Sequence, residues 1–285
     1  MKTKRHPGAG IEIWDVDLRV ADDDTFARIR ALFDEHGLLF FRGQELSEED
    51  HIALARRFGT INVNRFFVAH ADYPEIAMVA KAPEERFNIG GGWHTDHSYD
   101  VEPALGSVLV ARELPATGGD TCFVSMYDAF ATLPVRVQER LRGMNAVHSS
   151  KHVFGSKTAL LRRLTGSQNQ VKNPELADAM EDVVHPVVIK HPLSGREALY
   201  VNPGFTIRFE GRSLLRSLPL LGYLYAHATR ARRVARFQWQ PGSVAVWDNR
   251  ATWHFAKNDY AGQRRVMHRI TIDGCPLTAA RSARA

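Results

Sequence analysis

The sequence predicts a mainly β protein, in which short antiparallel strands form a sandwich or barrel with helices around it. Candidate strands recur through the middle and C-terminal parts of the chain, and Gly and Pro turns separate them. The 285 residues are 44% hydrophobic and 24% charged, which is ordinary for a globular protein with a full core. We find neither an internal repeat nor a linker, so we expect residues 1–285 to form a single domain.

The first third of the chain mixes strands and helices. Residues 11–18 alternate well enough to form a strand, and residues 24–36 place apolar side chains at helical spacing. Residues 37–41 are an apolar run that is typical of a buried strand. At residues 47–59, a serine followed three positions later by an aspartate indicates a capping box that opens a second helix.

The remaining two thirds are rich in strands. Helical patterns interrupt them at residues 127–141 and 214–228, and residues 153–182 are polar and weakly patterned, which indicates a long surface insertion or lid. The predicted strands are residues 76–79, 105–111, 121–124, 184–190, 199–202, 235–240, 243–247 and 265–272.

Composition excludes several classes of protein. Cys122 and Cys275 lie far apart, which argues against a disulfide scaffold or a cysteine-based zinc site. No apolar run approaches a membrane span, and no apolar segment follows the basic N-terminus, so we expect a cytoplasmic protein that does not bind membranes. A net charge of +5 could indicate binding to nucleic acid. The basic residues cluster at Arg230, Arg232, Arg233 and Arg236, which is more typical of a solvated helix end, so we expect no nucleic-acid partner.

A histidine and a carboxylate stand two residues apart in the segment GGGWHTD. On an extended strand His94 and Asp96 project from the same face and can bind one cation together. A second histidine would complete a facial triad of the kind that holds Fe(II) with open positions. The same spacing occurs at His70 and Asp72, but Tyr-Pro follows there and indicates a turn.

Two arginines near the C-terminus share one face of a predicted strand. Arg265 and Arg269 are four residues apart, so they project together with Met267, while Val266 and His268 project from the other face. Burying two guanidinium groups is costly without anions to pair with. Either this is an edge strand with surface arginines, or the interior of the barrel binds anionic ligands, since arginine offers a bidentate fork to carboxylates.

These motifs, in this order and at these spacings, resemble the Fe(II)- and 2-oxoglutarate-dependent oxygenases of the taurine/2,4-dichlorophenoxyacetate dioxygenase type. The matching segments are WHTD at 93–96, GGDT at 118–121, WDNRATWH at 247–254 and RRVMHR at 264–269, and the resemblance spans nearly the whole chain. It implies a double-stranded β-helix core, the cupin-like jelly roll, with flanking helices. It also implies Fe(II), 2-oxoglutarate and O2 as cofactor and cosubstrates.

The resemblance assigns roles residue by residue. It places His94, Asp96 and His254 on the iron, and it gives Thr121 and Arg265 the distal carboxylate of 2-oxoglutarate. Asp248 and Asn249 belong to the matched motif and look structural, and nothing marks Cys122 as reactive.

The match departs from the taurine enzymes at the positions that contact substrate. Asn64 replaces a histidine that meets the sulfonate, Phe67 replaces a tyrosine, and Phe154 and Phe205 align with aromatic pocket positions. Arg269 matches the arginine near the anionic head of the substrate and the cosubstrate. The site thus gains apolar surface, which favours a bulkier substrate than taurine: an alkylsulfonate, a sulfate ester or an aryloxyalkanoate.

The resemblance implies hydroxylation of a small anionic organic substrate with release of succinate and CO2. A cupin-like metal-binding or sensor protein without turnover would be the alternative, and it would be expected to lack a ligand or the cosubstrate arginine. His148 and His152 have the spacing of one helix face and could form a second metal pair, but the segment lacks the glutamate of a zincin motif, which argues against it. Relatives of this type are often homodimers or homotetramers.

Overall fold

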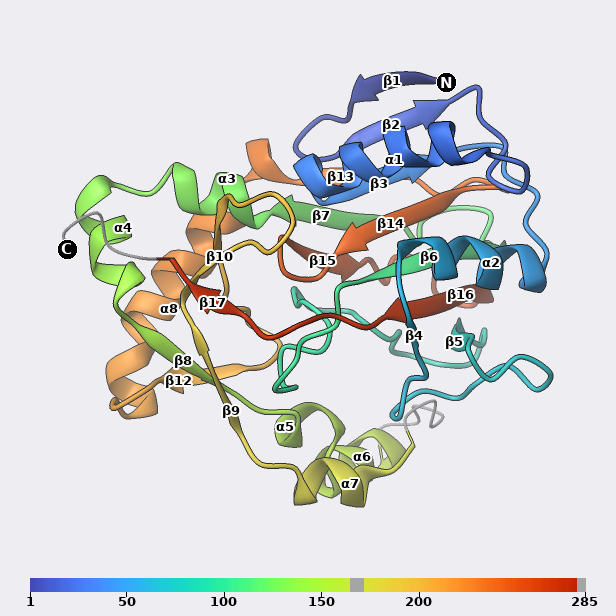
Figure 1. Cartoon of the computed structure of the whole chain (residues 1–285). Coiled ribbons are helices and arrows are strands. Elements are labelled where there is room, and N and C mark those ends of the chain that lie inside the picture. The colour runs from blue at the N-terminus through green and yellow to red at the C-terminus, as the bar shows by residue number, and fades with distance from the viewer. Residues whose placement is uncertain (165–171, 281–285) are drawn as a thin grey trace.

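The computed structural model describes residues 1–164 and 172–280. Within these ranges an eight-stranded sheet forms the centre of the fold (Figure 1). Its paired strands are antiparallel except for β2 and β3, which are parallel. In spatial order the strands are β1 (Lys2–Arg5), β2 (Ile11–Trp14), β3 (Leu38–Phe41), β14 (Val244–Asp248), β6 (Gly106–Glu113), β16 (Arg265–Ile272) and β4 (Ile61–Asn62), and β5 (Ala77–Lys81) also pairs with β16.

One face of this sheet is covered by α1 (Asp23–His36) and α2 (Glu48–Phe58). Alternation along the strands explains which side chains face the helices, since residues two apart point the same way. The buried cluster on this face includes Val108, Val246 and Ile270 from the strands. Phe33 and Phe58 from the two helices pack on each other within it, with ring centroids 5.2 Å apart.

The other face packs against a three-stranded sheet of β13 (Ala235–Phe237), β7 (Thr121–Ser125) and β15 (Thr252–Ala256). Phe40 of the main sheet stacks on Phe237 of the small sheet with centroids 4.3 Å apart. Met267 and Trp247 from the main sheet belong to the same buried cluster. Two sheets therefore enclose a shared apolar layer, as in a sandwich.

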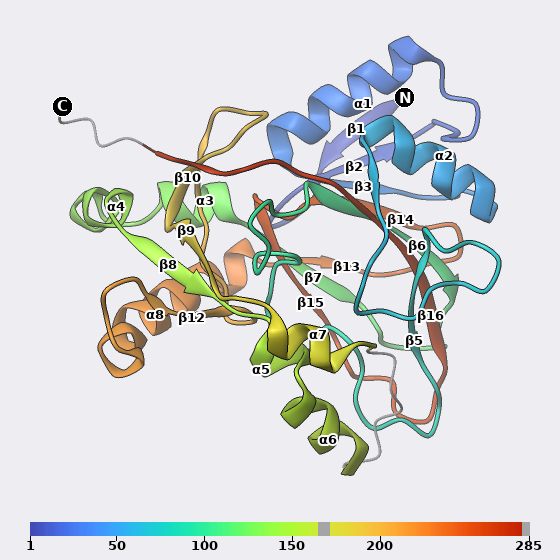
Figure 2. The same ribbon diagram turned by 60° about the horizontal axis from the view of Figure 1, so that its bottom comes forward.

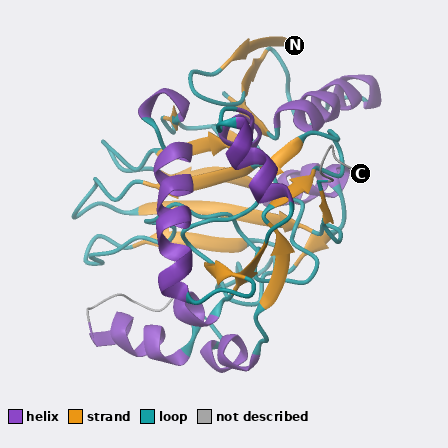
Figure 3. Cartoon of the chain, turned by 90° about the vertical axis from the view of Figure 1, so that its left-hand side faces the viewer, coloured by secondary structure: helices purple, strands orange, loops and turns teal. Residues whose placement is uncertain are grey.

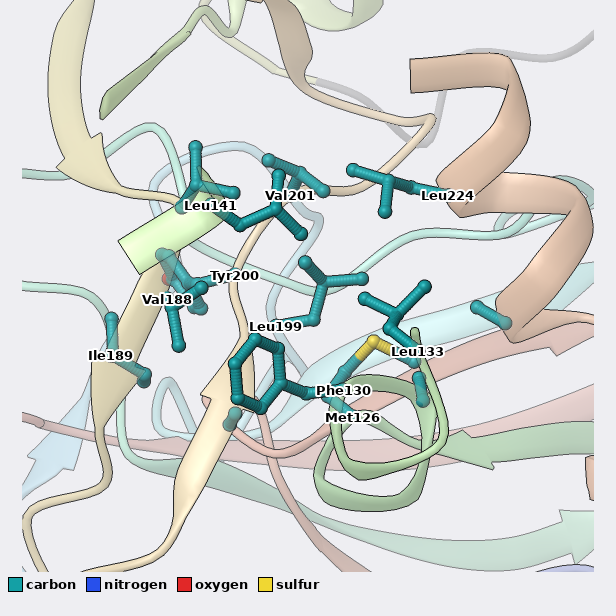
Figure 4. Packing of buried hydrophobic residues seen from close by; sticks show 14 of the residues in the cluster. Met126, Phe130, Leu133, Leu141, Val188, Ile189, Leu199, Tyr200, Val201 and Leu224 are labelled. Atoms are coloured by element: carbon teal, nitrogen blue, oxygen red, sulfur yellow. The ribbon is translucent and has the colours of Figure 1, made fainter. Parts of the chain in front are cut away.

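A second apolar core lies beside this sandwich (Figure 4). It is formed by α3 (Met126–Ala131), α4 (Val135–Arg142) and α8 (Leu214–Ala228) against a sheet of β11 (Glu197–Leu199), β10 (Val188–Lys190) and β17 (Thr278–Ala279). Phe130, Leu199 and Leu224 meet there. A neighbouring sheet joins β12 (Thr206–Phe209), β8 (Asn145–His148) and β9 (Val183–Pro186), and the short 3-10 helix Ala231–Arg233 follows α8.

Three short helices group together at one end of the molecule, at the bottom of Figure 2. They are α5 (Lys151–Phe154), α6 (Ser156–Leu164) and α7 (Pro174–Ala179). The insertion predicted at 153–182 thus contains helices, and its residues 165–171 lie outside the described part of the chain. Figure 3 shows the helices lying outside the strands, which confirms a mainly β fold with flanking helices.

The predicted helices are confirmed in three cases and wrong in one. The side chain of Ser47 accepts from the backbone of Asp50 and the reciprocal bond is present, so the capping box exists. Residues 127–141 were expected to form one helix, but α3 ends at Ala131 and α4 begins at Val135. Pro134 separates them, because proline has no N–H to donate and disfavours helical geometry in the residue before it.

The predicted strands are mostly in place but differ at their ends. Residues 265–272 match β16, whereas residues 184–190 form β9 and β10 in two different sheets. The prediction for residues 11–18 was too long, since β2 ends at Trp14. Strands β1, β4, β8, β12, β15 and β17 were not predicted. No helix in the described ranges is long and apolar enough to span a membrane.

Candidate active site

The strand β15 and the loop before β6 bring two histidines together. His94 and His254 form an isolated antiparallel bridge, in which each backbone N–H donates to the other residue's carbonyl, at 3.1 and 2.8 Å. Gly204 packs against this bridge, and a Cβ there would lie only 2.6 Å from the His94 Cβ. Glycine at 204 therefore permits the close approach that positions His94.

The three predicted metal ligands converge at one point. Asp96 Oδ1 lies 3.7 Å from His94 Nε2, and Asp96 Oδ2 lies 3.7 Å from His254 Nε2. All three ligand atoms lie within 4.8 Å of one another. These separations are too long for hydrogen bonds but suit atoms that share one ion, since each ligand stands about 2.0–2.2 Å from a bound metal.

The protonation of the histidines favours metal binding. His94 Nδ1 donates to the Gly92 carbonyl at 2.7 Å, which leaves the Nε2 lone pair facing Asp96. Burial lowers the pKa of His254 well below its usual range, and the neighbouring His94 adds to this effect. Neutral imidazole is the form that binds metal.

Asp96 is buried and remains ionised. Burial raises its pKa, but the Arg269 guanidinium, aided by the neighbouring His254 and His94 rings, has the stronger effect and holds the pKa below its ordinary value. Arg269 Nη1 donates to Asp96 Oδ2 at 2.8 Å. Thr95, between the two ligands, points away and donates to the carbonyl of Asn249, so the alternation expected of an extended segment holds.

Arg265 and Thr121 lie at the same cavity as the triad. Arg265 is 4% exposed, and among the described residues its Nε and Nη2 atoms have no hydrogen-bond partner. Trp239 donates from its indole to Thr121 Oγ1 at 2.9 Å. Gly119 has φ of 73° and a Cβ on it would crowd the Arg265 side chain at 3.2 Å, which explains a glycine in the GGDT segment.

Arg269 is also only partly satisfied. Besides its bond to Asp96, its guanidinium lies over the Phe67 ring at 4.6 Å from the centroid. Its Nε and Nη2 atoms are buried and have no hydrogen-bond partner within the described ranges. Two buried arginines with unused N–H groups in one cavity favour a ligand with two carboxylates, as 2-oxoglutarate has.

The cavity has a volume of about 450 Å³ and contains the triad and both arginines. Phe67, Phe154 and Phe205 line it, as predicted from the resemblance. They belong to one buried aromatic cluster, in which Phe154 and Phe205 have centroids 5.8 Å apart. The wall beside the triad is thus apolar and aromatic.

Asn64 was expected to contact the substrate, but it is not among the residues that line the cavity. Its Oδ1 accepts from the backbone N–H groups of Phe66 and Phe67 at 2.9 and 3.1 Å. Its Nδ2 lies 3.2 Å from His97 Nε2. Asn64 therefore holds Phe67 in place instead of facing the cavity.

Other residues weighed from the sequence lie elsewhere. His70 lies near Glu48 and His268 in a second group of potential metal ligands, but Arg112 donates to His268 Nδ1 at 3.1 Å and a guanidinium there disfavours a cation. Asp72 is exposed and belongs to no such group in the described ranges.

The pair His148 and His152 does not share a helix, which agrees with the sequence argument against a second metal pair there. His148 ends β8 and is buried against Tyr200, while His152 lies in α5 and donates to the Gly204 carbonyl at 2.7 Å. Cys122 is buried, and its pKa is raised by that burial, which argues against a reactive thiol.

Asp248 and Asn249 are structural, as expected. Asp248 accepts two bonds from the Arg250 guanidinium, at 3.0 and 2.7 Å, one from the Arg250 backbone at 2.8 Å, and one from His191 at 3.1 Å. Asn249 Oδ1 accepts from the Trp247 indole, whose ring lies 4.7 Å from that of His254. The motif thus fixes the strand ends that carry the metal ligand.

Sequence reasoning missed several residues of the site. Trp239 orients Thr121, and Trp247, Leu109 and Arg162 line the cavity. Inward alternation on the strands could have identified Trp247 and Leu109. Nothing in the sequence placed Trp239 beside Thr121, since 118 positions separate them.

A His-Asp-His triad beside two buried arginines, between the sheets of a mainly β fold, defines a non-haem iron oxygenase that uses a dicarboxylate cosubstrate. The family model described as "Taurine catabolism dioxygenase TauD, TfdA family" matches residues 3–271. The chain belongs to this family. It is a 2-oxoglutarate-dependent dioxygenase that uses Fe(II), 2-oxoglutarate and O2.

Individual relatives agree with this membership. An alpha-ketoglutarate-dependent sulfate ester dioxygenase of Pseudomonas putida is 32% identical over 94% of this chain and 89% of its own length. An alpha-ketoglutarate-dependent 2,4-dichlorophenoxyacetate dioxygenase of Cupriavidus pinatubonensis is 34% identical over 94% and 96%. The crystal structure of a taurine dioxygenase from Burkholderia xenovorans superposes with a TM-score of 0.80 at 29% identity, and covers 99% of this chain and 93% of its own.

These findings distinguish between the two functions considered from the sequence, a dioxygenase and a binding protein without turnover. A metal-binding or sensor protein without turnover finds no support, since the relatives are named as dioxygenases and the triad and both arginines are all present. The substrate is a small organic molecule.

Proposed function

We propose that this chain hydroxylates a small anionic organic molecule with an apolar body, on iron held by His94, Asp96 and His254. One observation carries the proposal: the triad and two buried arginines with unused N–H groups lie in one cavity with an aromatic wall. The donor set of two neutral imidazoles and one carboxylate fits Fe(II).

Arg265 and Thr121 bind and orient 2-oxoglutarate in this proposal. Arg265 donates to the distal carboxylate, and Thr121, held by Trp239, contributes its hydroxyl. Arg269 keeps Asp96 ionised through its 2.8 Å bond and offers its remaining N–H groups to a second carboxylate. Arg265, Arg269 and Asp96 are buried, so little water surrounds their charges, which strengthens each contact.

When bound, Fe(II) with 2-oxoglutarate supplies the O2-dependent hydroxylation of an unactivated C–H bond, with release of succinate and CO2. The chain's part is to hold the target carbon beside the triad. Phe67, Phe154 and Phe205 bury the apolar body of the substrate and limit its movement. If the hydroxylated carbon carries a sulfate, sulfonate or aryloxy group, the product collapses to a carbonyl compound and that group leaves.

The substrate class follows from the aromatic wall and from the relatives. Those relatives include the sulfate ester and 2,4-dichlorophenoxyacetate dioxygenases and an alkylsulfatase of Acinetobacter baylyi that is 33% identical over 91% of this chain. Sulfate esters, alkylsulfonates and aryloxyalkanoates all join an anion to an apolar body. Taurine fits less well, because its amine would face phenylalanine rings and Asn64 is already occupied by the backbone of Phe66 and Phe67.

We further infer that residues 1–285 form one domain with a double-stranded β-helix core. The packing of β7, β13 and β15 across from the main sheet is consistent with that arrangement. The triad and the arginines come from segments between residues 94 and 269, so the site depends on both sheets.

The test measures succinate release with Fe(II), ascorbate and 2-oxoglutarate in the presence of hexyl sulfate, hexanesulfonate, 2,4-dichlorophenoxyacetate or taurine. We expect His94→Ala and Asp96→Ala to abolish succinate formation and iron binding while the fold is retained. Arg265→Ala should raise the 2-oxoglutarate KM at least tenfold, because a charge-assisted pair is lost. Full activity in either ligand variant would contradict the iron assignment.

A matched control is available in the chain. His70→Ala and Asp72→Ala change the same residue types at the same spacing outside the cavity, and both variants should keep iron binding and turnover. If only the substrate KM rose in Arg265→Ala, the roles given to Arg265 and Arg269 would have to be exchanged.

A further inference from the structure

His97, which directly follows the metal ligand Asp96, has an unusual backbone conformation. Its φ is 59°, in the left-handed region that a residue with a Cβ occupies at a cost in free energy. The conformation turns the chain sharply after Asp96, and the backbone N–H of Asp100 donates to the His97 carbonyl at 3.1 Å. Such a conformation persists where surrounding contacts hold it, so the partners of the His97 side chain show what fixes this turn.

Both ring nitrogens of His97 have a partner, although the residue is buried. Nδ1 lies 2.9 Å from Asp100 Oδ2, and Nε2 lies 3.2 Å from Asn64 Nδ2. The Asn64 Oδ1 accepts from the backbone N–H groups of Phe66 and Phe67, so the amide nitrogen of Asn64 is the end that faces His97. An amide nitrogen only donates. Nε2 of His97 therefore accepts, and Nδ1 carries the hydrogen that is donated to Asp100.

These bonds form a continuous chain of donors and acceptors between two loops. It runs from the Asp100 carboxylate through the His97 ring to the Asn64 amide, which holds the backbone of Phe67. His185 of β9 donates to the Asp100 carbonyl at 2.9 Å, so the far end of the chain is anchored to a strand. Removing one member would leave a buried polar group unpaired, which costs more free energy than the bond itself contributes.

Phe67, at the other end of this chain, belongs to the wall of the cavity that holds the triad. The guanidinium carbon of Arg269 lies 4.6 Å from the Phe67 ring centroid, and Arg269 donates to Asp96 at 2.8 Å. Asp96 is therefore connected to Phe67 in two ways. One connection passes along the backbone to His97 and then through Asn64, and the other passes through Arg269. The place of an aromatic ring in the wall is thus tied to the place of a metal ligand.

We propose that His97 is a positioning residue for the organic substrate: it holds Asn64, Asn64 fixes the Phe67 ring, and that ring sets where the apolar body of the substrate lies. This inference deepens the proposed function and rests on it. His97 is not among the residues that line the cavity, so it acts through Phe67 and does not touch the substrate itself. Asn64 likewise affects substrate binding from outside the cavity.

The experiment is a double-mutant cycle of His97 and Phe67. His97→Asn suits the backbone, because asparagine also adopts positive φ, but its side chain is too short to bond Asp100 and Asn64 together. The probe is whichever of hexyl sulfate and 2,4-dichlorophenoxyacetate the wild-type protein binds more tightly, titrated without oxygen into the Fe(II)- and 2-oxoglutarate-loaded protein. We expect His97→Asn to raise the Kd about threefold to tenfold on its own, and by less than about twofold in a Phe67→Ala background.

Hydrogen exchange of the backbone amides gives a readout that needs no substrate. The amides of Phe66 and Phe67 donate to Asn64, so they should exchange about threefold to tenfold faster in His97→Asn, while the amides of α2 should exchange as in the wild-type protein. Asn64→Ala breaks the same chain of bonds at its next member. It should give both results again, which keeps the proposal testable if His97→Asn does not fold.

The control is Asp15→Asn, a change to the same residue at an exposed position whose φ is also positive, at 54°. It should leave the Kd and the exchange rates as in the wild-type protein. Equal losses of affinity with and without the Phe67 ring would overturn the proposal, and so would unchanged exchange of the Phe66 and Phe67 amides in His97→Asn. If the wild-type protein bound neither probe, the proposed substrate class would fail, and the exchange rates would still decide whether His97 holds Phe67 in place.

Discussion

A single hydrogen bond orients Thr121, which we propose binds 2-oxoglutarate together with Arg265. Trp239 donates its indole N–H to Thr121 at 2.9 Å, and its ring lies 6.0 Å from the guanidinium carbon of Arg265. Replacing Trp239 by Phe keeps the ring and removes the donor. We expect the Kd of 2-oxoglutarate to rise about threefold to tenfold, since one hydrogen bond contributes roughly 0.5–1.5 kcal/mol.

The measurement is a titration of 2-oxoglutarate followed by calorimetry on the Fe(II)-loaded protein. Trp14→Phe in β2, a tryptophan outside the cavity, serves as the matched control and should leave the Kd unchanged. Equal affinities in wild type and Trp239→Phe would show that Thr121 needs no orienting partner.

Some residues of the site could be predicted from the spacing of their close neighbours in the sequence, and others could not. His94 and Asp96 could be predicted from spacing, because residues two apart on extended backbone share a face. Arg265 and Arg269 could be paired for the same reason. Asn64 could not be placed, because its amide satisfies the backbone two and three residues away, and sequence alignment cannot show which way a short polar side chain turns.

Whole elements were easiest to predict where one face is buried and the ends are capped. The helix α2 has its capping box, and β16 alternates between arginines on one side and Ile270 and Ile272 on the other. Short strands such as β8 and β15 gave little signal, because four or five residues are too few to establish a period. Helix α6 lies in the weakly patterned insertion, so the sequence did not predict it as a helix.

At the scale of elements, the loop between β11 and β12 contacts the metal ligand His94 through Gly204. A Cβ at residue 204 would lie 2.6 Å from the His94 Cβ, so either the loop or the histidine must shift. We expect Gly204→Ala to weaken Fe(II) binding at least tenfold, because a displaced imidazole can no longer meet Asp96 at the same point. Iron content after dialysis against graded Fe(II) measures this.

The control for that change is Gly222→Ala within α8, where a new Cβ meets nothing within 4 Å. Alanine there should stabilise the helix by about 1 kcal/mol and leave iron binding alone. If Gly204→Ala bound iron as well as Gly222→Ala, the close approach of the loop would have no bearing on the site.

On the scale of the whole molecule, buried polar groups connect the layers. Asp248 at the end of β14 accepts from His191, which lies between β10 and β11, so the main sheet is joined to the second core. Burial opposes ionisation of Asp248, but the stronger effect of Arg250 and His191 holds its pKa below the ordinary value. Such a network fixes one relative arrangement of layers that apolar packing alone would leave less specific.

Buried neutral histidines make the stability of the entire chain sensitive to acid. His51 of α2 lies against the main sheet with its Nε2 3.1 Å from the Val108 carbonyl. Burial, partly opposed by the Val108 contact and reinforced by the nearby Arg112 and His268, lowers its pKa to about 3. In the unfolded chain this histidine has a pKa near 6.5, so below that pH the unfolded chain binds a proton that the folded chain does not bind. The free energy of unfolding is therefore highest above pH ~6.5 and falls as the pH drops toward 3.

From this shift, His51 should cost the folded state about 2 kcal/mol between pH 7 and pH 5. We expect His51→Leu to lose less stability than the wild type over that interval by about this amount, whatever its stability at pH 7. Urea unfolding of the metal-free protein at half-unit pH steps measures the difference, and the other buried histidines cancel because both proteins contain them. Parallel stability curves would mean that His51 is protonated in the folded protein, which its burial between α2 and the sheet argues against.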